Sequence, residues 1–342
     1  MRILVTGAAG FVGFHVARMA LARGDAVVGF DNVNDYSDPA LKEARLAELA
    51  RMGGDWTFLR ADLADRAAVA AAFAGSGYDR VIHLAAQAGV RYSLENPMAY
   101  VESNLTGFTT ILEAARASAT PHLVYASTSS VYGGNTTMPF EEGQGVDHPL
   151  QFYAATKRAN ELMAHAYAHL YRLPCTGLRF FTVYGPWGRP DMAPMIFARA
   201  IAAGQPIRLF NQGRHSRDFT YVDDIADGVI RAADWIATPD PAFDPAHPDP
   251  ASSDAPYWIY NIGNGAPVPL LDFIAALERE IGRPAIRELL PLQPGDVPDT
   301  WADTARLEAA TGWRPRTSVD EGVRRFVEWF RAWEGIPSPA GP

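Results

Sequence analysis

The sequence has a single cysteine, Cys175, and no apolar run close to the ~20 residues that a membrane-spanning helix needs. One cysteine excludes an internal disulfide and is typical of a reducing compartment, so we expect a cytoplasmic protein with no membrane partner. Cys175 lies in a predicted strand, which favours a packed thiol over a nucleophile. The apolar opening of residues 1–5 breaks at Gly7, too early for the core of a signal peptide.

The sequence also lacks an excess of basic residues and any spacing typical of a metal site. Its formal net charge is −9, which gives no basic field for a nucleic acid. The histidines are scattered along the chain, so we predict no metal centre. A protein this acidic must concentrate its arginines locally if it binds an anionic ligand. With 342 residues, 48% of them hydrophobic, the chain can bury a full core and divide into two lobes.

Short apolar segments alternate with helical patterns through the first half of the chain. This alternation predicts an α/β fold of the Rossmann type, a doubly wound parallel sheet covered by helices on both faces. Helices are expected from the glycine-rich turn to Arg23, over 98–117 and over 153–171. The predicted strands are 2–6, 27–31, 56–61, 81–85, 122–127 and 176–181.

From about Tyr184 the chain is richer in Pro, Trp and Arg, and we expect a smaller C-terminal lobe interleaved with the first. The composition of 238–256 predicts a surface loop insertion or partial disorder. Later strands are predicted over 219–224 and 258–262, and helices over 270–281 and 319–333. The predicted domains are a nucleotide-binding domain over 1–183 with a return segment near 219–262, a substrate-binding lobe over 184–218 and 263–334, and a tail over 335–342.

Gly7, Gly10 and Gly13 follow the first predicted strand and open the first helix. In that context glycine lets the backbone turn tightly and approach a pyrophosphate, which sits at the positive N-terminus of the helix. Asp31 ends the second strand, where a carboxylate can bind ribose hydroxyls and repel a 2′-phosphate, so NAD is favoured over NADP. Asp62, after the third strand, is expected either to accept from the adenine amino group or to be a helix N-cap.

Tyr153 and Lys157 stand four apart in a predicted helix and therefore share one face. A nearby ammonium favours the phenolate, so we expect Lys157 to lower the pKa of the Tyr153 phenol. A phenol tuned in that way can take a proton from a substrate alcohol near neutral pH. Beside a dinucleotide, the pair suits the oxidation of a carbinol by hydride transfer.

These motifs resemble the extended short-chain dehydrogenase/reductase superfamily of nucleotide-sugar epimerases and dehydratases, over nearly the whole chain. Three further stretches, 86–92, 179–192 and 293–298, resemble UDP-glucuronate 4-epimerases within it. The superfamily resemblance rests on Gly7-x-x-Gly10-x-x-Gly13, His83-Leu-Ala-Ala86, Asn104, Thr128, Tyr153-x-x-x-Lys157 and Arg217-Asp-Phe-x-x-Val-Asp223.

The resemblance implies that Thr128 hydrogen-bonds the oxygen on carbon 4 of a sugar, that Tyr153 is the acid/base, and that Lys157 binds the nicotinamide ribose. It also implies NAD as cofactor, a UDP-sugar as substrate, and a homodimer built from helices 98–117 and 153–171. Asn104 resembles a structural asparagine of the superfamily. The implied cofactor site comprises Gly7, Gly10, Phe11, Val12, Gly13, Asp31, Asn32, Asp62, Leu63, Leu84, Ala85, Ala86, Asn104, Tyr153, Lys157, Phe180 and Val183.

Members of this superfamily first abstract hydride from carbon 4, which gives a 4-keto sugar. The 4,6-dehydratases carry Asp-Glu directly after the triad threonine, and UDP-glucuronate decarboxylases have a Glu at the second of these positions; here Ser129 and Ser130 stand there. Epimerisation needs no such carboxylate, because the keto sugar rotates about its pyrophosphate link and takes the hydride back on its other face. We therefore expect UDP-glucuronate to become UDP-galacturonate. The alternatives are 4-epimerisation of another UDP-hexose, a decarboxylase or 4,6-dehydratase, and an inactive nucleotide-sensing protein on the same fold.

A 4-keto uronic acid loses carbon dioxide easily, so fixed donors must hold its carboxylate. We expect Arg189 and Thr182, with Ser129 or Ser130, to do so, because an arginine can bind a carboxylate through two hydrogen bonds. The alternative for Arg189 is a surface or interlobe salt bridge. The other expected contacts are Arg217 on the pyrophosphate, Arg208, Leu209 and Phe210 against uracil, Arg91 on phosphate or in a structural pair, and Asp296 on ribose hydroxyls or in a structural turn. Gln293 stands where galactose epimerases usually place a phosphate-binding arginine.

Overall fold

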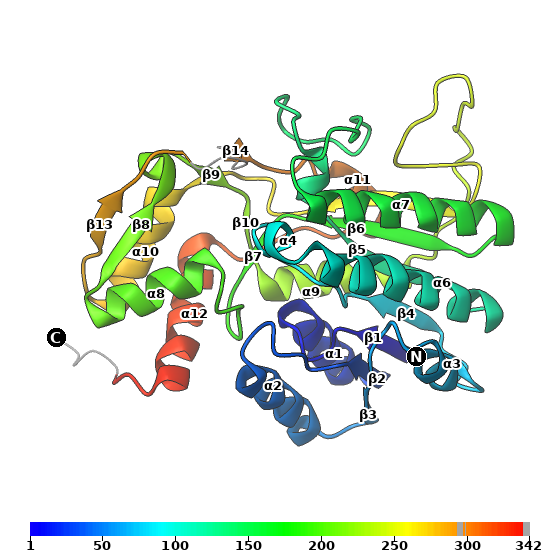
Figure 1. The fold of residues 1–342 in the computed structure, drawn as a ribbon, viewed down its shortest axis with the longest axis horizontal. Helices are drawn as coiled ribbons and strands as arrows, with labels where there is room; N and C mark the ends of the chain where they lie inside the picture. The colour runs from blue at the N-terminus through cyan, green and yellow to red at the C-terminus, as the bar shows by residue number, and fades with distance from the viewer. Residues whose placement is uncertain (293–296, 298, 338–342) are drawn as a thin grey trace.

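A seven-stranded parallel sheet forms the centre of the protein (Figure 1). The structure is a computed structural model that describes residues 1–292, 297 and 299–337. The strand order is β11-β6-β5-β4-β1-β2-β3, so the chain reverses its direction of travel across the sheet between β1 and β4. The predicted doubly wound α/β fold is therefore confirmed. The strands are β1 (Arg2–Thr6), β2 (Ala26–Asp31), β3 (Trp56–Arg60), β4 (Arg80–His83), β5 (Leu123–Thr128), β6 (Cys175–Phe180) and β11 (Tyr257–Ile262).

The two faces of the sheet bury alternate residues of each strand in separate cores. On β1, Ile3 and Val5 face one helical layer, and Leu4 faces the other. Cys175 is fully buried in the second core, where burial raises the pKa of its thiol, as expected of a packed cysteine. The first layer contains α1 (Phe11–Arg23), α2 (Pro39–Met52), α9 (Val222–Asp234) and α11 (Ala305–Thr311), and the second contains α3 (Arg66–Phe73), α6 (Gly107–Ala117) and α7 (Phe152–Tyr171).

A smaller lobe with its own apolar core lies beside the carboxyl ends of the strands (Figure 1). Phe273 is at its centre, stacked on Phe219 at a ring distance of 4.1 Å. A two-stranded pair, β7 (Thr182–Tyr184) with β10 (Phe219–Tyr221), connects it to the central sheet. The lobe contains α8 (Ala193–Ala203), β8 (Pro206–Leu209), a short turn η3 (Phe210–Gly213), α10 (Leu270–Ile281), β13 (Ile286–Leu289) and α12 (Val319–Glu334), with the short strands β9 (Ser216–Arg217), β12 (Val268–Pro269) and β14 (Asp299–Thr300).

Two predicted elements differ from the structure. The helix expected over 98–117 has three parts: α5 (Pro97–Tyr100), a π-helical turn η1 (Val101–Thr106) and α6. The strand expected over 219–224 ends at Tyr221, because Asp223 and Asp224 lie in the first turn of α9, where carboxylates are favourable. Segment 238–256 is an irregular loop, closed by hydrogen bonds between Asp240 and residues 252 and 253.

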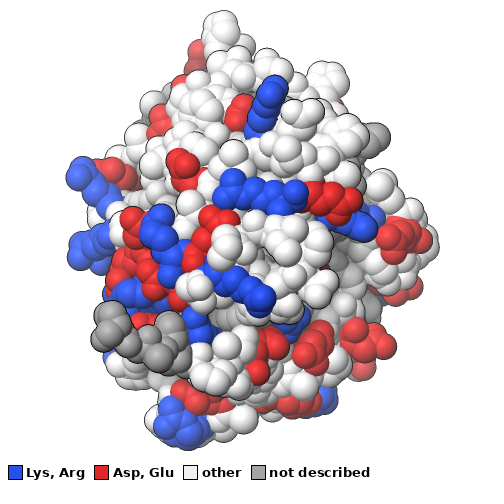
Figure 2. Space-filling model, turned by 90° about the vertical axis from the view of Figure 1, so that its left-hand side faces the viewer, with Lys and Arg blue, Asp and Glu red and all other residues white. Residues whose placement is uncertain are grey.

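The course of the chain supports interleaved lobes, since β11 returns to the central sheet beside β6. The exact domain boundaries stay a prediction, and the expected tail falls largely on 338–342, outside the described residues. No helix in the described part of the chain is long and apolar enough to cross a membrane. On the face that Figure 2 shows, basic and acidic side chains are interleaved. Helices α10 and α12 contribute ion pairs of this kind, Arg279 with Asp320 and Arg324 with Glu321.

Leu178 tests the central core, because it is fully buried on β6 between β5 and β11. We expect Leu178→Ala to lower the free energy of unfolding by about 2–5 kcal/mol, since the cavity left behind adds to the lost transfer energy. Leu289→Ala is the matched control, because Leu289 also lies in a strand but is 58% exposed. Urea denaturation of both variants measures the difference, and equal losses would contradict this assignment of the core.

Candidate active site

The glycine loop joins β1 to α1 at the carboxyl edge of the sheet, beside the point where the strand order reverses. Gly7 has φ +75°, and a Cβ there would lie 2.7 Å from the backbone nitrogen of Ala85. A Cβ on Gly13 would overlap the carbonyl oxygen of Gly7. Gly10 is the N-cap residue of α1, and no side chain caps this helix. The first N–H groups of α1 are therefore presented to a ligand at a helix N-terminus, as an anion requires.

Asp31 lies at the end of β2 and clamps the glycine loop. Its carboxylate accepts hydrogen bonds from the backbone N–H of Ala9 at 3.1 Å and of Val33 at 2.8 Å. Burial raises the pKa of Asp31, whereas the Val33 N–H and the Lys42 ammonium lower it. Two oxygens with further lone pairs stay at the strand end, where a ribose can reach them.

Asp62 follows β3, but it is not the N-cap of α3. Its carboxylate accepts from the side-chain amide of Asn32 at 2.7 Å and from the backbone N–H of Ala64. Asp65 caps α3 instead, accepting from two backbone N–H groups. The N-cap alternative for Asp62 is therefore wrong, because the helix begins one turn later. Asp62 and Asn32 form one exposed polar pair beside Asp31.

The segment after β4 is fixed by Asn104 of the π-helical turn. The Asn104 side chain accepts from the backbone N–H of Gln87 at 2.8 Å and donates to the Gln87 carbonyl and to Thr156. Asn160 of α7 donates to the Asn104 carbonyl. Both amide hydrogens of Asn104 are thus used within the protein, which supports a structural role. These hydrogen bonds of Asn104, called the Asn104 knot below, connect the segment that ends at Gln87 to the helix that carries Tyr153 and Lys157.

Tyr153 and Lys157 lie on α7, opposite Thr128 at the end of β5. Tyr153 is in the first turn of α7, where the helix dipole favours a negative charge. Lys157 is almost completely buried, and its ammonium makes no hydrogen bond within the described ranges. Burial lowers the pKa of Lys157 to about 8, although the Glu161 carboxylate opposes this shift.

Burial raises the pKa of the Tyr153 phenol, while the Arg189 guanidinium and a hydrogen bond from Thr128 lower it. The prediction that the neighbouring ammonium lowers this pKa is therefore wrong for the protein alone. Desolvation of the phenolate outweighs the charges around the ring. The three groups of the predicted triad nevertheless converge on one place.

These residues fit a dinucleotide. A pyrophosphate can accept hydrogen bonds from the uncapped N-terminus of α1 and can approach the backbone of Gly7, Gly10 and Gly13, which carries no side chains. The Asp31 carboxylate can accept hydrogen bonds from a ribose. The buried ammonium of Lys157 needs an oxygen partner, which a second ribose can offer. Leu63 follows β3, and Leu84, Ala85 and Ala86 follow β4. Phe180 ends β6, Val183 lies within β7, and Phe11 and Val12 open α1.

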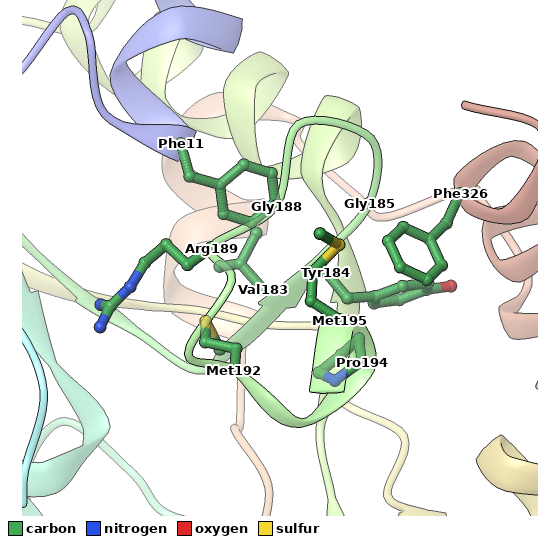
Figure 3. Close-up of a pocket in the computed structure, with 10 residues that line it drawn as sticks. All are labelled: Phe11, Val183, Tyr184, Gly185, Gly188, Arg189, Met192, Pro194, Met195 and Phe326. Atoms are coloured by element: carbon green, nitrogen blue, oxygen red, sulfur yellow. The ribbon is translucent and has the colours of Figure 1, made fainter. Parts of the chain in front are cut away.

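Arg189 reaches the site from the loop that follows β7. Figure 3 shows its side chain extending away from the apolar residues around Phe11 and Val183, which pack between the two lobes. Its guanidinium donates to the Asp191 carboxylate at 3.1 and 2.5 Å, and it lies close enough to Tyr153 to lower the pKa of that phenol. Arg189 thus forms a local ion pair within its own loop, and its contact with a uronate carboxylate stays a prediction.

The other predicted sugar contacts lie around the triad. Ser129 and Ser130 form a 3₁₀ turn, η2 (Ser129–Tyr132), and the backbone N–H of Ser130 donates to the Thr128 hydroxyl at 3.2 Å. Thr182 begins β7 and is half-buried.

The structure brings together only some of the residues predicted to contact the nucleotide. The Arg91 guanidinium lies 5.5 Å from the ring centre of Phe210, although 119 positions separate them in the chain. Arg208 pairs with Glu288, and the Leu209 side chain is fully buried in the core of the smaller lobe, so it cannot contact uracil. Arg217 donates to the carbonyl of Ser216. Asp296 and Gln293 lie outside the described residues.

Sequence reasoning missed four residues at this site. The Tyr36 hydroxyl lies beside the Arg189 guanidinium, and Lys42 donates to Asn34 next to Asp31. Arg45 donates to the carbonyl of Ala9 at 2.8 Å and to that of Trp187 at 2.5 Å, which ties the glycine loop to the Arg189 loop. Glu161 continues the four-residue spacing of Tyr153 and Lys157, a signal that the sequence does contain.

Comparisons with known proteins agree on one family. A sequence model of the NAD dependent epimerase/dehydratase family matches residues 3–244. A probable UDP-glucuronate 4-epimerase of Rhizobium meliloti is 51% identical over 96% of this chain and 97% of its own. The crystal structure of UDP-glucuronic acid 4-epimerase from Bacillus cereus, with UDP-glucuronic acid and NAD, has a TM-score of 0.85, with 30% identity over 97% of this chain and 100% of that one. A UDP-glucose 4-epimerase from Thermotoga maritima has a TM-score of 0.84 and 27% identity, over 98% and 100% of the two chains.

Gly13 tests the cofactor cradle. We expect Gly13→Ala to weaken NAD binding by about 5- to 150-fold, because the new methyl group overlaps the Gly7 carbonyl and overpacking of this kind costs roughly 1–3 kcal/mol. Gly134→Ala is the control, since a Cβ there meets its nearest atoms only at 4.0 Å. Calorimetric titration with NAD measures both variants. Unchanged affinity in Gly13→Ala would disprove the close approach of loop and cofactor.

Proposed function

Since the chain belongs to the NAD-dependent epimerase/dehydratase family, we propose that it converts UDP-glucuronate into UDP-galacturonate by inverting carbon 4. Its cofactor is NAD, and its substrate class is the UDP-sugars. The single observation that carries the proposal is the convergence of Thr128, Tyr153 and Lys157 beside Arg189, with hydroxyls in place of carboxylates at positions 129 and 130. The similarity to UDP-glucuronate 4-epimerases supports the choice of sugar.

Tyr153 acts as the base that takes the proton from the carbon 4 hydroxyl, and Thr128 hydrogen-bonds the same oxygen. Bound NAD supplies a transient hydride acceptor, so carbon 4 passes through a ketone. Rotation of the keto sugar about its pyrophosphate link presents the opposite face, and Tyr153 returns the proton after reduction there. Lys157 holds a ribose hydroxyl and keeps a positive charge beneath the site.

The charges around Tyr153 explain how a half-buried phenol can lose its proton. Burial raises its pKa, whereas Arg189, Thr128 and the N-terminus of α7 favour the phenolate. A sugar that brings its hydroxyl into hydrogen-bond contact supplies the proton directly. The phenolate therefore needs to exist only while substrate is bound.

Arg189 is proposed to hold the uronate carboxylate. Its guanidinium presents a two-pronged donor surface, which the Asp191 carboxylate occupies through Nε and Nη2. A substrate carboxylate fits the same geometry and must share or replace that contact. When the carboxylate is held, the bond between carbon 5 and the carboxylate carbon stays out of alignment with the π-system of the ketone. This suppresses loss of carbon dioxide. Without carboxylates at 129 and 130, no acid/base group serves dehydration at carbons 5 and 6.

We further propose a homodimer in the cytoplasm. The helices predicted to form the interface expose apolar side chains, among them Met98, Leu162 and Leu170, each more than half exposed in the single chain. Removal of these side chains from water favours association. The reduced, buried Cys175 supports a reducing compartment.

Tyr153 tests the chemistry. We expect Tyr153→Phe to lower kcat by about 100- to 10,000-fold, because the proton acceptor is lost while the ring is kept. Incubation with UDP-glucuronate, followed by chromatography of the nucleotide sugars, should give UDP-galacturonate and no pentose in the unaltered protein. UDP-xylose would favour a decarboxylase, and a 4-keto-6-deoxy sugar would favour a dehydratase.

Arg189 tests the choice of sugar. We expect Arg189→Ala to reduce kcat/KM for UDP-glucuronate by about 10- to 100-fold, because a charge-assisted hydrogen-bonded pair is lost. Any turnover of UDP-galactose should change far less. Arg199→Ala is the control, since Arg199 also forms an ion pair, with Glu334, on the smaller lobe. A loss of the same size for both sugars would refute the uronate contact.

A further inference from the structure

A buried carboxylate lies one helical turn beyond Lys157 on α7. Glu161 is completely buried, and its spacing from Lys157 equals that between Lys157 and Tyr153. Residues four apart lie on one face of a helix, so the three side chains form one row. A carboxylate with no access to water is costly unless charged or polar groups surround it.

Three side chains from three places in the fold hold the Glu161 carboxylate. Arg179 of β6 donates through Nε at 2.9 Å and through Nη2 at 3.0 Å, one bond to each oxygen. The Ser127 hydroxyl on β5 donates at 2.6 Å, and Arg158 of α7 donates at 3.0 Å. Ser127 directly precedes Thr128. The carboxylate therefore fixes the strand that carries Thr128 against the helix that carries Tyr153 and Lys157.

We propose that Glu161 is a positioning residue of the active site, a fixed negative charge that keeps Lys157 in its ammonium form under the cofactor. The role of Lys157 under the cofactor rests on the proposed function, but the charge coupling itself does not depend on which sugar is bound. The roles of Thr128, Tyr153 and Lys157 do not by themselves require a carboxylate at position 161.

The electrostatics around Lys157 support this role. Burial lowers its pKa to about 8, and within the described residues the Glu161 carboxylate is the charge that opposes the shift. Burial, together with the positive charge of Lys157, lowers the pKa of His83 on β4 to about 3. This histidine therefore stays neutral at physiological pH. The fully buried Tyr125 and the buried Tyr257 stay neutral because burial raises their pKa values.

Arg179 gives a second reason why loss of the Glu161 charge disfavours the ammonium form of Lys157. Its guanidinium is fully buried and has its main ion pair with Glu161. Without the carboxylate, this cation would stand uncovered near the site and repel a second positive charge. Loss of the Glu161 charge therefore acts on Lys157 twice in the same direction, by lost attraction and by new repulsion. A carboxylate that only ties α7 to β6 would change stability and leave the titration of Lys157 where it was.

The sequence offers a direct test, because Lys42 and Lys157 are its only lysines. Protein grown with ¹³Cε-labelled lysine should give two side-chain signals in a pH titration without substrate. We expect the Lys157 midpoint near pH 8 in the unaltered protein and about one pH unit lower in Glu161→Gln, while the Lys42 midpoint stays constant. Glu161→Asp keeps the charge and should restore most of the shift.

Glu142→Gln is the matched control, because Glu142 is also a buried carboxylate but does not act on the pKa of Lys157. If Glu161→Gln does not fold, the double variant Glu161→Gln/Arg179→Gln removes both buried charges, and the midpoint should still fall, by less. The alkaline limb of kcat/KM should move with the Lys157 midpoint. An unmoved midpoint in the folded variant would overturn the proposal. A moved midpoint in a protein without epimerase activity would overturn the proposed function alone.

Discussion

The buried ammonium of Lys157 is the group on which the arrangement of this site depends. A positive charge taken out of water is unfavourable by several kcal/mol unless other groups replace its hydration. Here the replacement comes from two directions, the Glu161 carboxylate within the protein and the space in which a ribose fits. The same desolvation that lowers the pKa of Lys157 leaves its ammonium as a donor that needs an oxygen partner.

The other elements of the fold hold α7 beside the space in which a ribose fits. Parallel strands end at one edge of the sheet, so Asp31, Thr128 and the glycine loop meet although they are far apart in sequence. The Asn104 knot and the Glu161 contacts attach α7 to two different strand ends. These contacts hold α7 at Thr156, Asn160 and Glu161, which favours fixed positions for the phenol and the ammonium.

The sequence predicts most of this site because the decisive features are local. A glycine turn after a strand, an acidic residue at a strand end and a pair of side chains at helical spacing are visible within a few residues of chain. Contacts that depend on the packing of distant segments are not. The carbonyls that Arg45 joins lie 36 and 142 positions away, and Arg179 reaches Glu161 only because β6 lies beneath α7.

The errors of the sequence analysis have the same origin. The π-helical turn contains Asn104, whose contact with Gln87 joins segments that a periodic pattern does not connect. Leu209 is buried because its strand faces the core of the smaller lobe, and the exposed Arg208 beside it pairs with Glu288. The sign of the pKa shift of Tyr153 was misjudged because burial, which requires the full structure, exceeds the effect of a neighbouring charge.

The scarcity of lysine shows why position 157 is special. Apart from the histidines and Lys42, every other basic side chain is an arginine, whose guanidinium stays charged under ordinary conditions and presents a wide planar surface. A guanidinium at position 157 would place a larger planar group at the same point. An ammonium is compact, offers three donors and has a pKa that its surroundings can move. The site therefore needs lysine, and a carboxylate such as Glu161 determines how firmly that lysine keeps its proton.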